Sequence, residues 1–302
     1  MGNKKWRVEN FLLFDYRAVE AHLSKMAAKG WFLTKVGRVF WVYKKAESRR
    51  CHFAVTYFEN ATRYNPAHTQ EQKEFIDFCE KSGWKWICEW EQMQIFCSEQ
   101  KNPIPIETDE TVRLNTIHRA MKKGFLPFQG LLLIVFLNIM IQSKVFSGKP
   151  LIDILSSNLE MSGILNCVMM GTWVFGNLIG YAVWYFRSKK AVASEGGCIN
   201  SDFVRKISNI LLLLWMMAFL SLTVCCIQKI GFVETAVIFV YVIGLIVLAW
   251  LITTILKRAK LPAKANQVVT IIIIFLIILA TVNAVYNTPF NLFLRQPVYS
   301  YE

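Results

Sequence analysis

The sequence lacks the residue patterns that most metal proteins and many enzymes carry. Its eight cysteines include no CxxC pair, which argues against a disulfide framework and against a zinc site. None of the four histidines stands in an HExxH motif, and the fifteen glycines form no phosphate-binding loop. We therefore expect a protein that is not an enzyme and that uses no cofactor and no metal.

Charged residues are also missing from the middle of five long apolar runs. About 20 apolar residues are enough to cross the hydrocarbon core of a bilayer, whereas a soluble helix needs a polar stripe that faces water. The runs therefore predict an all-α, multi-pass membrane domain of about five helices over residues 125–288. The predicted spans are residues 125–146, 163–186, 207–227, 232–256 and 268–286.

The absence of ionisable groups inside these spans also bears on transport. Proteins that move ions or polar solutes usually keep such groups within the membrane. The spans offer only asparagine, glutamine and threonine side chains, whose commoner role is hydrogen bonding between helices. A membrane transporter or export accessory protein for a hydrophobic solute is therefore kept as the alternative function.

The N-terminal stretch MGNKKWRVEN has no apolar core, so we expect no cleavable signal peptide. Basic residues cluster before the first span, between the second and third spans, and between the fourth and fifth. The opposite side has only Lys149, Lys229 and Arg295. The positive-inside rule then predicts a cell-membrane protein with a cytoplasmic N-terminus and an extracytoplasmic tail at 289–302. Because topology explains most of the net charge of +13, we expect no nucleic acid as a partner.

Residues 1–98 hold much of the charge and repeat one pattern twice. In AAKGWFL (27–33) and EKSGWKW (80–86), a helical segment ends at a glycine that a tryptophan follows at once. We predict an α+β head, a duplicated βαββ unit with helices on one face of an antiparallel sheet. The predicted elements are residues 6–14, 16–29, 31–36 and 39–45 in the first copy, and 51–58, 70–82, 84–90 and 93–99 in the second.

The ends of these elements carry their own signals. Asp15 is expected to cap the first helix, and Thr69 with Gln72 resembles a capping box at the start of the second. A short turn at Gly37-Arg38 is expected to join the first pair of strands. After the head, the polar and proline-containing residues 99–112 predict a linker, so that residues 99–124 form a linker and a basic juxtamembrane helix.

Aromatic residues are frequent on alternating strand positions of the head. In WKWICEW, alternation places Trp84, Trp86, Cys88 and Trp90 on one face, and a sheet with helices on one side leaves its other face to water or a partner. Trp31 and Trp84 are expected to be core. We predict a binding site for a protein partner or for a hydrophobic or cationic small molecule. Its residues are Trp41, Tyr43, Trp86 and Trp90.

Three segments carry a resemblance to a known family: FDYRAVEAHLSKMAAKGWFL (14–33), FAVTYFEN (53–60) and CEKSGW (79–84). With the apolar C-terminal part, they resemble the family called domain of unknown function 2812, over residues 10 to about 100. The resemblance implies a bacterial membrane protein, often encoded beside PadR-type transcriptional regulators, and it implies no functional residue. The βαββ order is also similar to effector-binding domains that hold hydrophobic cations in an aromatic cleft.

These observations converge on one expectation. The chain is predicted to be a multi-pass protein of the lipid bilayer with a cytoplasmic binding or sensor head. Signalling or a membrane-stress response is the expected setting for such a head.

Overall fold

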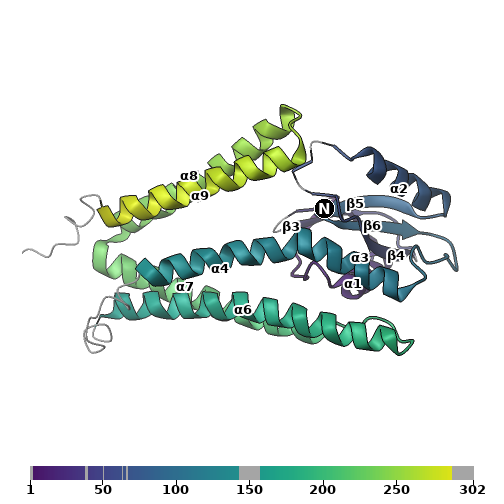
Figure 1. Cartoon of the computed structure of the whole chain (residues 1–302), viewed down its shortest axis with the longest axis horizontal. Helices are drawn as coiled ribbons and strands as arrows, with labels where there is room; N and C mark the ends of the chain where they lie inside the picture. The colour runs from purple at the N-terminus through teal and green to yellow at the C-terminus, as the bar shows by residue number, and fades with distance from the viewer. Residues whose placement is uncertain are drawn as a thin grey trace, which may run out of the picture. The chain divides into compact units, whose positions relative to one another are not determined.

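The chain forms two compact units in a computed structural model (Figure 1). The structure describes residues 3–37, 40–49, 51–62, 64–65, 67–142 and 157–287, so Arg38 of the predicted turn and the predicted tail at 289–302 lie outside the described residues. The first unit comprises residues 1–63, 68–148 and 167–216, and the second comprises residues 64–67, 149–166 and 217–302. The first unit therefore contains most of the head together with the helices next to it.

The strands of the head form two three-stranded antiparallel sheets (Figure 1). One sheet has the order β1 (Lys4–Val8), β3 (Phe40–Lys45), β2 (Trp31–Val36), and the other has the order β4 (His52–Tyr57), β6 (Met93–Ser98), β5 (Lys85–Trp90). Helix α1 (Tyr16–Ala28) follows β1, and helix α2 (Gln70–Lys81) follows β4. Both copies run strand, helix, strand, strand, with the last strand central in its sheet, which confirms the predicted duplication.

Both copies also carry a bulge at the same place. The register between β2 and β3 shifts between Leu33 and Lys35, and the register between β5 and β6 shifts between Trp86 and Cys88. In each copy the shift falls at the fourth residue after the glycine that ends the helix. A bulge breaks the strict alternation of side chains along a strand. The repeated position supports a true structural duplication beyond the shared element order.

The bulge in β5 overturns the prediction that four of its residues share one face. Trp84 and Trp86 pack in a cluster beneath α2 with Ile76, Cys79 and Phe96. Cys88 and Trp90, which come after the bulge, pack instead in the main core of the head. The rule that alternate residues share a strand face fails here, because the extra residue reverses the face of every side chain that follows it.

The helix ends are set by local chemistry. Gly30 and Gly83 have φ angles of +76° and +89°, the left-handed conformation that side chains disfavour, and this confirms both predicted helix stops. The Thr69 side chain accepts a hydrogen bond from the backbone N–H of Gln72 at 3.2 Å, as the capping-box pattern indicates. The Gln72 side chain does not return to Thr69 and reaches Glu89 at 2.7 Å instead.

The main core of the head extends onto helix α3 (Glu110–Lys123). Val19 and Leu23 of α1 face the core as their helical spacing predicts, and both are buried. Leu114, Ile117 and Met121 of α3 are buried in the same cluster. The core of the head is thus shared by elements on both sides of residues 99–112 in the sequence. The predicted limits of the head and the linker stay predictions.

Beyond α3 the described part of the chain consists of long helices (Figure 1). Among the described residues, four helical stretches are long and apolar enough to cross a membrane: 110–141, 158–193, 202–230 and 232–258. The fifth predicted span corresponds to a helix whose described apolar part is shorter. The helices are α4 (Phe125–Gln142), α6 (Asn158–Ala193), α7 (Asp202–Ile230), α8 (Phe232–Arg258) and α9 (Ala263–Asn287).

In the first unit, α6 packs closely against its neighbours through glycines. A Cβ atom on Gly171 would lie 2.7 Å from the Phe136 ring of α4, and one on Gly180 would lie 2.5 Å from Val204 of α7. Between the same two helices, the Ser208 hydroxyl donates a buried hydrogen bond of 2.6 Å to Asn177. Small residues and such polar bonds are typical of helix packing in membranes.

Candidate functional site at the junction of the head and the membrane helices

Asp15, which precedes α1, forms a buried link to the start of α7. Its side chain is 0% exposed, and it accepts a hydrogen bond of 2.5 Å from the Ser201 hydroxyl. Its second carboxylate oxygen forms an ion pair with Arg205 at 3.0 Å. Arg205 is also paired with Asp202. The expected helix-capping bond of Asp15 is absent, so that prediction is wrong. The charged guanidinium is a stronger partner for the carboxylate than a backbone N–H.

Burial alters the proton affinity of this carboxyl group. The pKa of Asp15 is raised to about 6 by burial, against the lowering effects of the Ser201 hydrogen bond and the Arg205 charge. A buried carboxylate is retained only where a partner compensates its desolvation. The link therefore depends on Arg205, and it responds to pH near neutrality.

Phe11 packs between α1 and the first sheet, beside His22 and Trp41, whereas Phe14 packs on the helices. The predicted strand over 6–14 ends at Val8, because the residues that follow find aromatic partners elsewhere. The Phe14 ring lies 5.0 Å from the ring of Trp184 and 5.2 Å from that of Tyr181, both on α6. The Arg205 guanidinium lies over the Phe11 ring at 5.2 Å. Asp15 is fully buried, whereas the Arg205 side chain has Phe11 on one face and stays 20% exposed.

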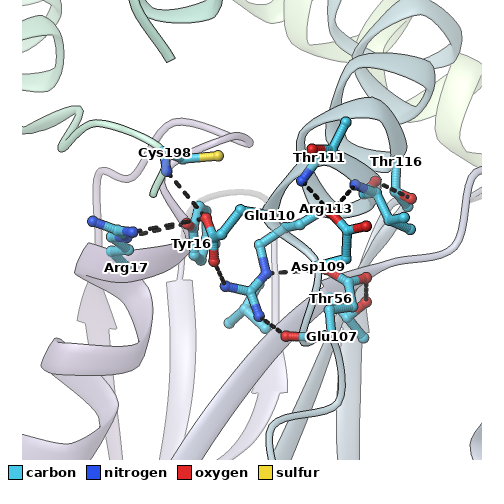
Figure 2. Close-up of polar contacts among 12 residues, drawn as sticks. Tyr16, Arg17, Thr56, Glu107, Asp109, Glu110, Thr111, Arg113, Thr116 and Cys198 are labelled. Atoms are coloured by element: carbon cyan, nitrogen blue, oxygen red, sulfur yellow. Dashed lines mark hydrogen bonds and ion pairs between the residues drawn. The ribbon is translucent and has the colours of Figure 1, made fainter. Parts of the chain in front are cut away.

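A second polar network joins α1, the segment before α3, α3 and the α6–α7 loop (Figure 2). Arg113 donates to the Glu107 side chain at 3.1 Å and to Glu110 at 2.5 Å. The other oxygen of Glu110 accepts the backbone N–H of Cys198 at 3.0 Å and lies 3.9 Å from Arg17. A single carboxylate therefore bridges the head, α3 and the loop.

A pocket of about 430 Å³ opens beside this network. Its charged lining comes from Glu20, Glu107 and Arg113, and its other walls include the outer edge of β4 and residues 101–106. Glu20 accepts the backbone N–H of Val55 at 2.8 Å. Burial raises the pKa of Glu20 to about 7. A recess that contains a carboxyl group of altered pKa is a candidate binding site.

The four aromatic residues predicted to bind a ligand do not form one surface. Trp41 and Tyr43 are 1% and 0% exposed and belong to the main core, so they present no surface to a ligand here. Trp90 is partly buried and lies against Trp41, with ring centroids 5.8 Å apart. Trp86 is partly buried in the other cluster. A binding role for these residues stays a prediction, and Trp86 and Trp90 are where it can be tested.

Trp86 lies beside a polar group beneath α2. Its indole N–H donates to Gln94 at 3.2 Å, and Gln72 and Gln94 both donate to Glu89. His68 lies 3.6 Å from Glu89 and packs edge-on against the Trp86 ring. Strict alternation along the strand would place Glu89 and Trp86 on opposite faces, but the bulge that follows Trp86 directly lets them share this environment.

Residues 15–128 match the family described as "Protein of unknown function (DUF2812)". The matched residues include both helices of the repeat and α3, and they begin at Asp15. The chain thus resembles this family over the head and its junction helix. No curated protein and no solved structure matches the chain.

Sequence reasoning missed the residues that form the junction. From the sequence, Asp15 was predicted to cap a helix. Arg205 was considered only as one of the basic residues that flank a span. One signal was available: Arg205 lies in the first turn and a half of α7, where the helix dipole disfavours a positive charge. Such a placement indicates a nearby anion. In the part of the chain that the structure describes, no three histidine, cysteine or acidic side chains gather to hold a metal.

Proposed function

We propose that this chain is a membrane-bound sensor whose cytoplasmic head binds a ligand or partner and passes the effect to the membrane helices. The observation that carries the proposal is the Asp15–Arg205 pair, in which a fully buried carboxylate joins the head to the first turns of α7. A head that served only as a tether would not need an ionic link buried at this point. Signalling or a membrane-stress response fits a protein of this design.

The junction also supports the proposed orientation. The head contacts the α6–α7 loop through Glu110 and Cys198, so the loop and the head lie on the same side of a membrane that α6 and α7 cross. The loop and its flanks hold Arg187, Lys189 and Lys190, and basic residues of this kind favour the cytoplasm. Contact and charge therefore support the same placement of the head.

Tetraphenylphosphonium, a hydrophobic cation, is a suitable first probe of the head. The full chain is placed in lipid nanodiscs, and binding is followed by quenching of tryptophan fluorescence. Hydrogen–deuterium exchange of residues 196–205 then reports whether binding reaches the start of α7. If the proposal holds, the probe slows exchange there in the wild-type chain, and Asp15→Asn combined with Arg205→Met abolishes this response without abolishing quenching.

Two variants assign the binding event to a place. Trp86→Ala and Trp90→Ala should weaken quenching by at most a few tens-fold, since a ring–cation contact contributes about 0.5–2 kcal/mol. Trp41→Ala is the matched core control and should unfold the head, because truncating a buried tryptophan costs about 3–5 kcal/mol. Quenching that leaves exchange at residues 196–205 unchanged in the wild-type chain would contradict a sensor function.

A second candidate function is transport, or assistance to export, of a hydrophobic solute. One observation favours it: an apolar pocket of about 450 Å³ lies among α4, α6 and α7, lined by residues such as Phe136, Met140 and Leu211. Accumulation of a hydrophobic dye in vesicles that contain the full chain tests this function. Equal uptake by vesicles with and without the protein would rule the candidate out.

A further inference from the structure

The pocket in the head lies along a strand edge that has no strand partner among the described residues. In its sheet, β4 pairs only with β6, so its other edge faces the pocket. Residues 101–106 run past this edge as a strap, held by a hydrogen bond of 2.8 Å from the Trp84 indole to the carbonyl of Ile104. Pro103 and Pro105 occupy alternate positions of the strap. Because proline has no N–H, neither residue can donate to β4 as part of a paired strand.

Glu20 closes part of this edge, and no arginine or lysine of the described residues forms an ion pair with it. Its carboxylate accepts one hydrogen bond, from the N–H of Val55, and no ion pair of Glu20 is found within the described ranges. The nearby guanidinium of Arg113 is already engaged by Glu107 and Glu110. The pocket thus contains one carboxylate that no ion pair holds, although the charges of Arg113 and Arg17 lie near enough to favour its ionised form.

We propose that this pocket binds a small organic cation, an amine or amidine, whose N–H groups bond to Glu20. The apolar body of such a ligand lies against Phe53, Val55 and the proline strap. This inference rests on the proposed sensor function, since it names the class of ligand that the head receives. It places the ligand away from the predicted aromatic residues and next to the network that joins the head to α3.

The surroundings of Glu20 favour a cation with N–H donors over a quaternary or phosphonium cation. A carboxylate forms its strongest contacts with charged donors in hydrogen-bonding geometry. The remaining charged or titratable groups of the lining are His52 and Lys101, both exposed, and the paired Glu107 and Arg113. None of them offers a second free carboxylate, so a ligand with a single positive charge matches the pocket best.

Benzamidine and benzamide provide a matched pair of probes, because they share a shape and differ in charge. Binding of each to the full chain in nanodiscs is measured by calorimetry. We expect saturable binding of benzamidine and binding of benzamide that is at least about tenfold weaker, as the loss of a charged hydrogen bond predicts. Equal affinities, or no binding of benzamidine up to about 10 mM, would overturn the inference without any variant.

Glu20→Gln then assigns the charge to one residue. The amide oxygen can still accept the N–H of Val55, so the variant is expected to fold, which its melting temperature checks. Benzamidine affinity should fall by about ten- to a hundredfold. Glu47→Gln removes an exposed carboxylate elsewhere in the head and should leave affinity unchanged. Wild-type affinity in Glu20→Gln would place the cation elsewhere and refute the assignment.

The pH dependence gives an independent readout. Because burial raises the pKa of Glu20 to about 7, benzamidine affinity should rise from pH 6 to pH 8 as the carboxyl loses its proton. Glu20→Gln should therefore show a smaller rise than the wild-type chain, and an equal rise in both would refute a role for Glu20.

The same samples separate this inference from the proposed function. Hydrogen–deuterium exchange at residues 196–205 is measured with and without benzamidine. Binding that depends on Glu20 but leaves this exchange unchanged supports the pocket and contradicts the sensor. Binding of tetraphenylphosphonium that slows the exchange, with no binding of benzamidine, supports the sensor and contradicts the pocket.

Discussion

Replacing Arg205 by methionine should weaken the junction by an amount that depends on pH. Asp15 is fully buried and has its main counter-charge in Arg205. Breaking a buried ion pair commonly costs about 3–5 kcal/mol. The loss is smaller here at neutral pH, because a carboxyl group whose pKa is already about 6 takes up a proton when its partner is removed.

The size of this loss follows from the pKa. At pH 7 the paired carboxylate lies one unit above its pKa, so its ionised form is favoured by only about 1.4 kcal/mol over the protonated form. Removing Arg205 can forfeit no more than that through the charge of Asp15, and about 0.5–1 kcal/mol more through the lost contact with the Phe11 ring. We expect a total near 2 kcal/mol at pH 7, about 3 kcal/mol at pH 8, and little beyond the ring contact at pH 5.

Hydrogen–deuterium exchange of amides in residues 16–20 and 202–208, converted to opening free energies in nanodiscs, measures this loss. Arg205→Met combined with Asp15→Asn should lose this dependence on pH, because the buried carboxyl group of Asp15 is then gone. Arg17→Met is the control: its pair with Glu110 is 3.9 Å long and partly exposed, so we expect a change within about 0.5 kcal/mol. A loss in Arg205→Met that is constant from pH 6 to pH 8 would refute the reasoning.

Three further predictions concern the junction, the repeat and the topology. The pKa of the Asp15 carboxyl is about 6 when the head is packed on α7, whereas the pKa of an exposed aspartate is about 4. The packed state therefore binds the proton more tightly, and it should be more stable at pH 5 than at pH 7 by about 1 kcal/mol. Asp15→Asn should remove that difference in the same exchange assay. Gly30→Val and Gly83→Val should both lower the melting temperature of the full chain. The first should do so more, since its Cβ would lie 2.8 Å from a backbone oxygen whereas the second meets a flexible glutamine; equal or absent effects would contradict this. A reporter that is active only outside the membrane should be silent at Gly196 and active after Glu302, and the reverse would overturn the orientation.

Local chemistry explains what could be predicted about the head. The repeated glycine-tryptophan pair marked two helix ends, and both glycines have the left-handed conformation that such ends require. Strand propensity and turn spacing were enough to place β2 and β5 within a residue or so. These features depend on neighbours a few residues away, so they can be read along the chain.

The long apolar helices were predictable for a different reason. Lipid imposes the same demand on every spanning residue, so composition over some 20 residues decides the outcome without any knowledge of packing. The excess of basic residues beside the spans can also be predicted from composition. The ion-pair partner of an individual residue cannot, because the composition is the same whether an arginine is exposed beside a span or buried.

Only the tertiary structure decided what the charged and aromatic side chains do. One extra residue in β5 divided its tryptophans between two clusters. The alternation of residues along a strand does not show where a bulge will form. Trp41 became core because other elements cover its face of the sheet. Asp15 forgoes the helix cap that its position predicts, because Arg205, 190 residues later in the chain, lies 3.0 Å from its fully buried carboxylate. Burial multiplies the strength of such a contact, and burial arises only when segments distant in sequence pack together.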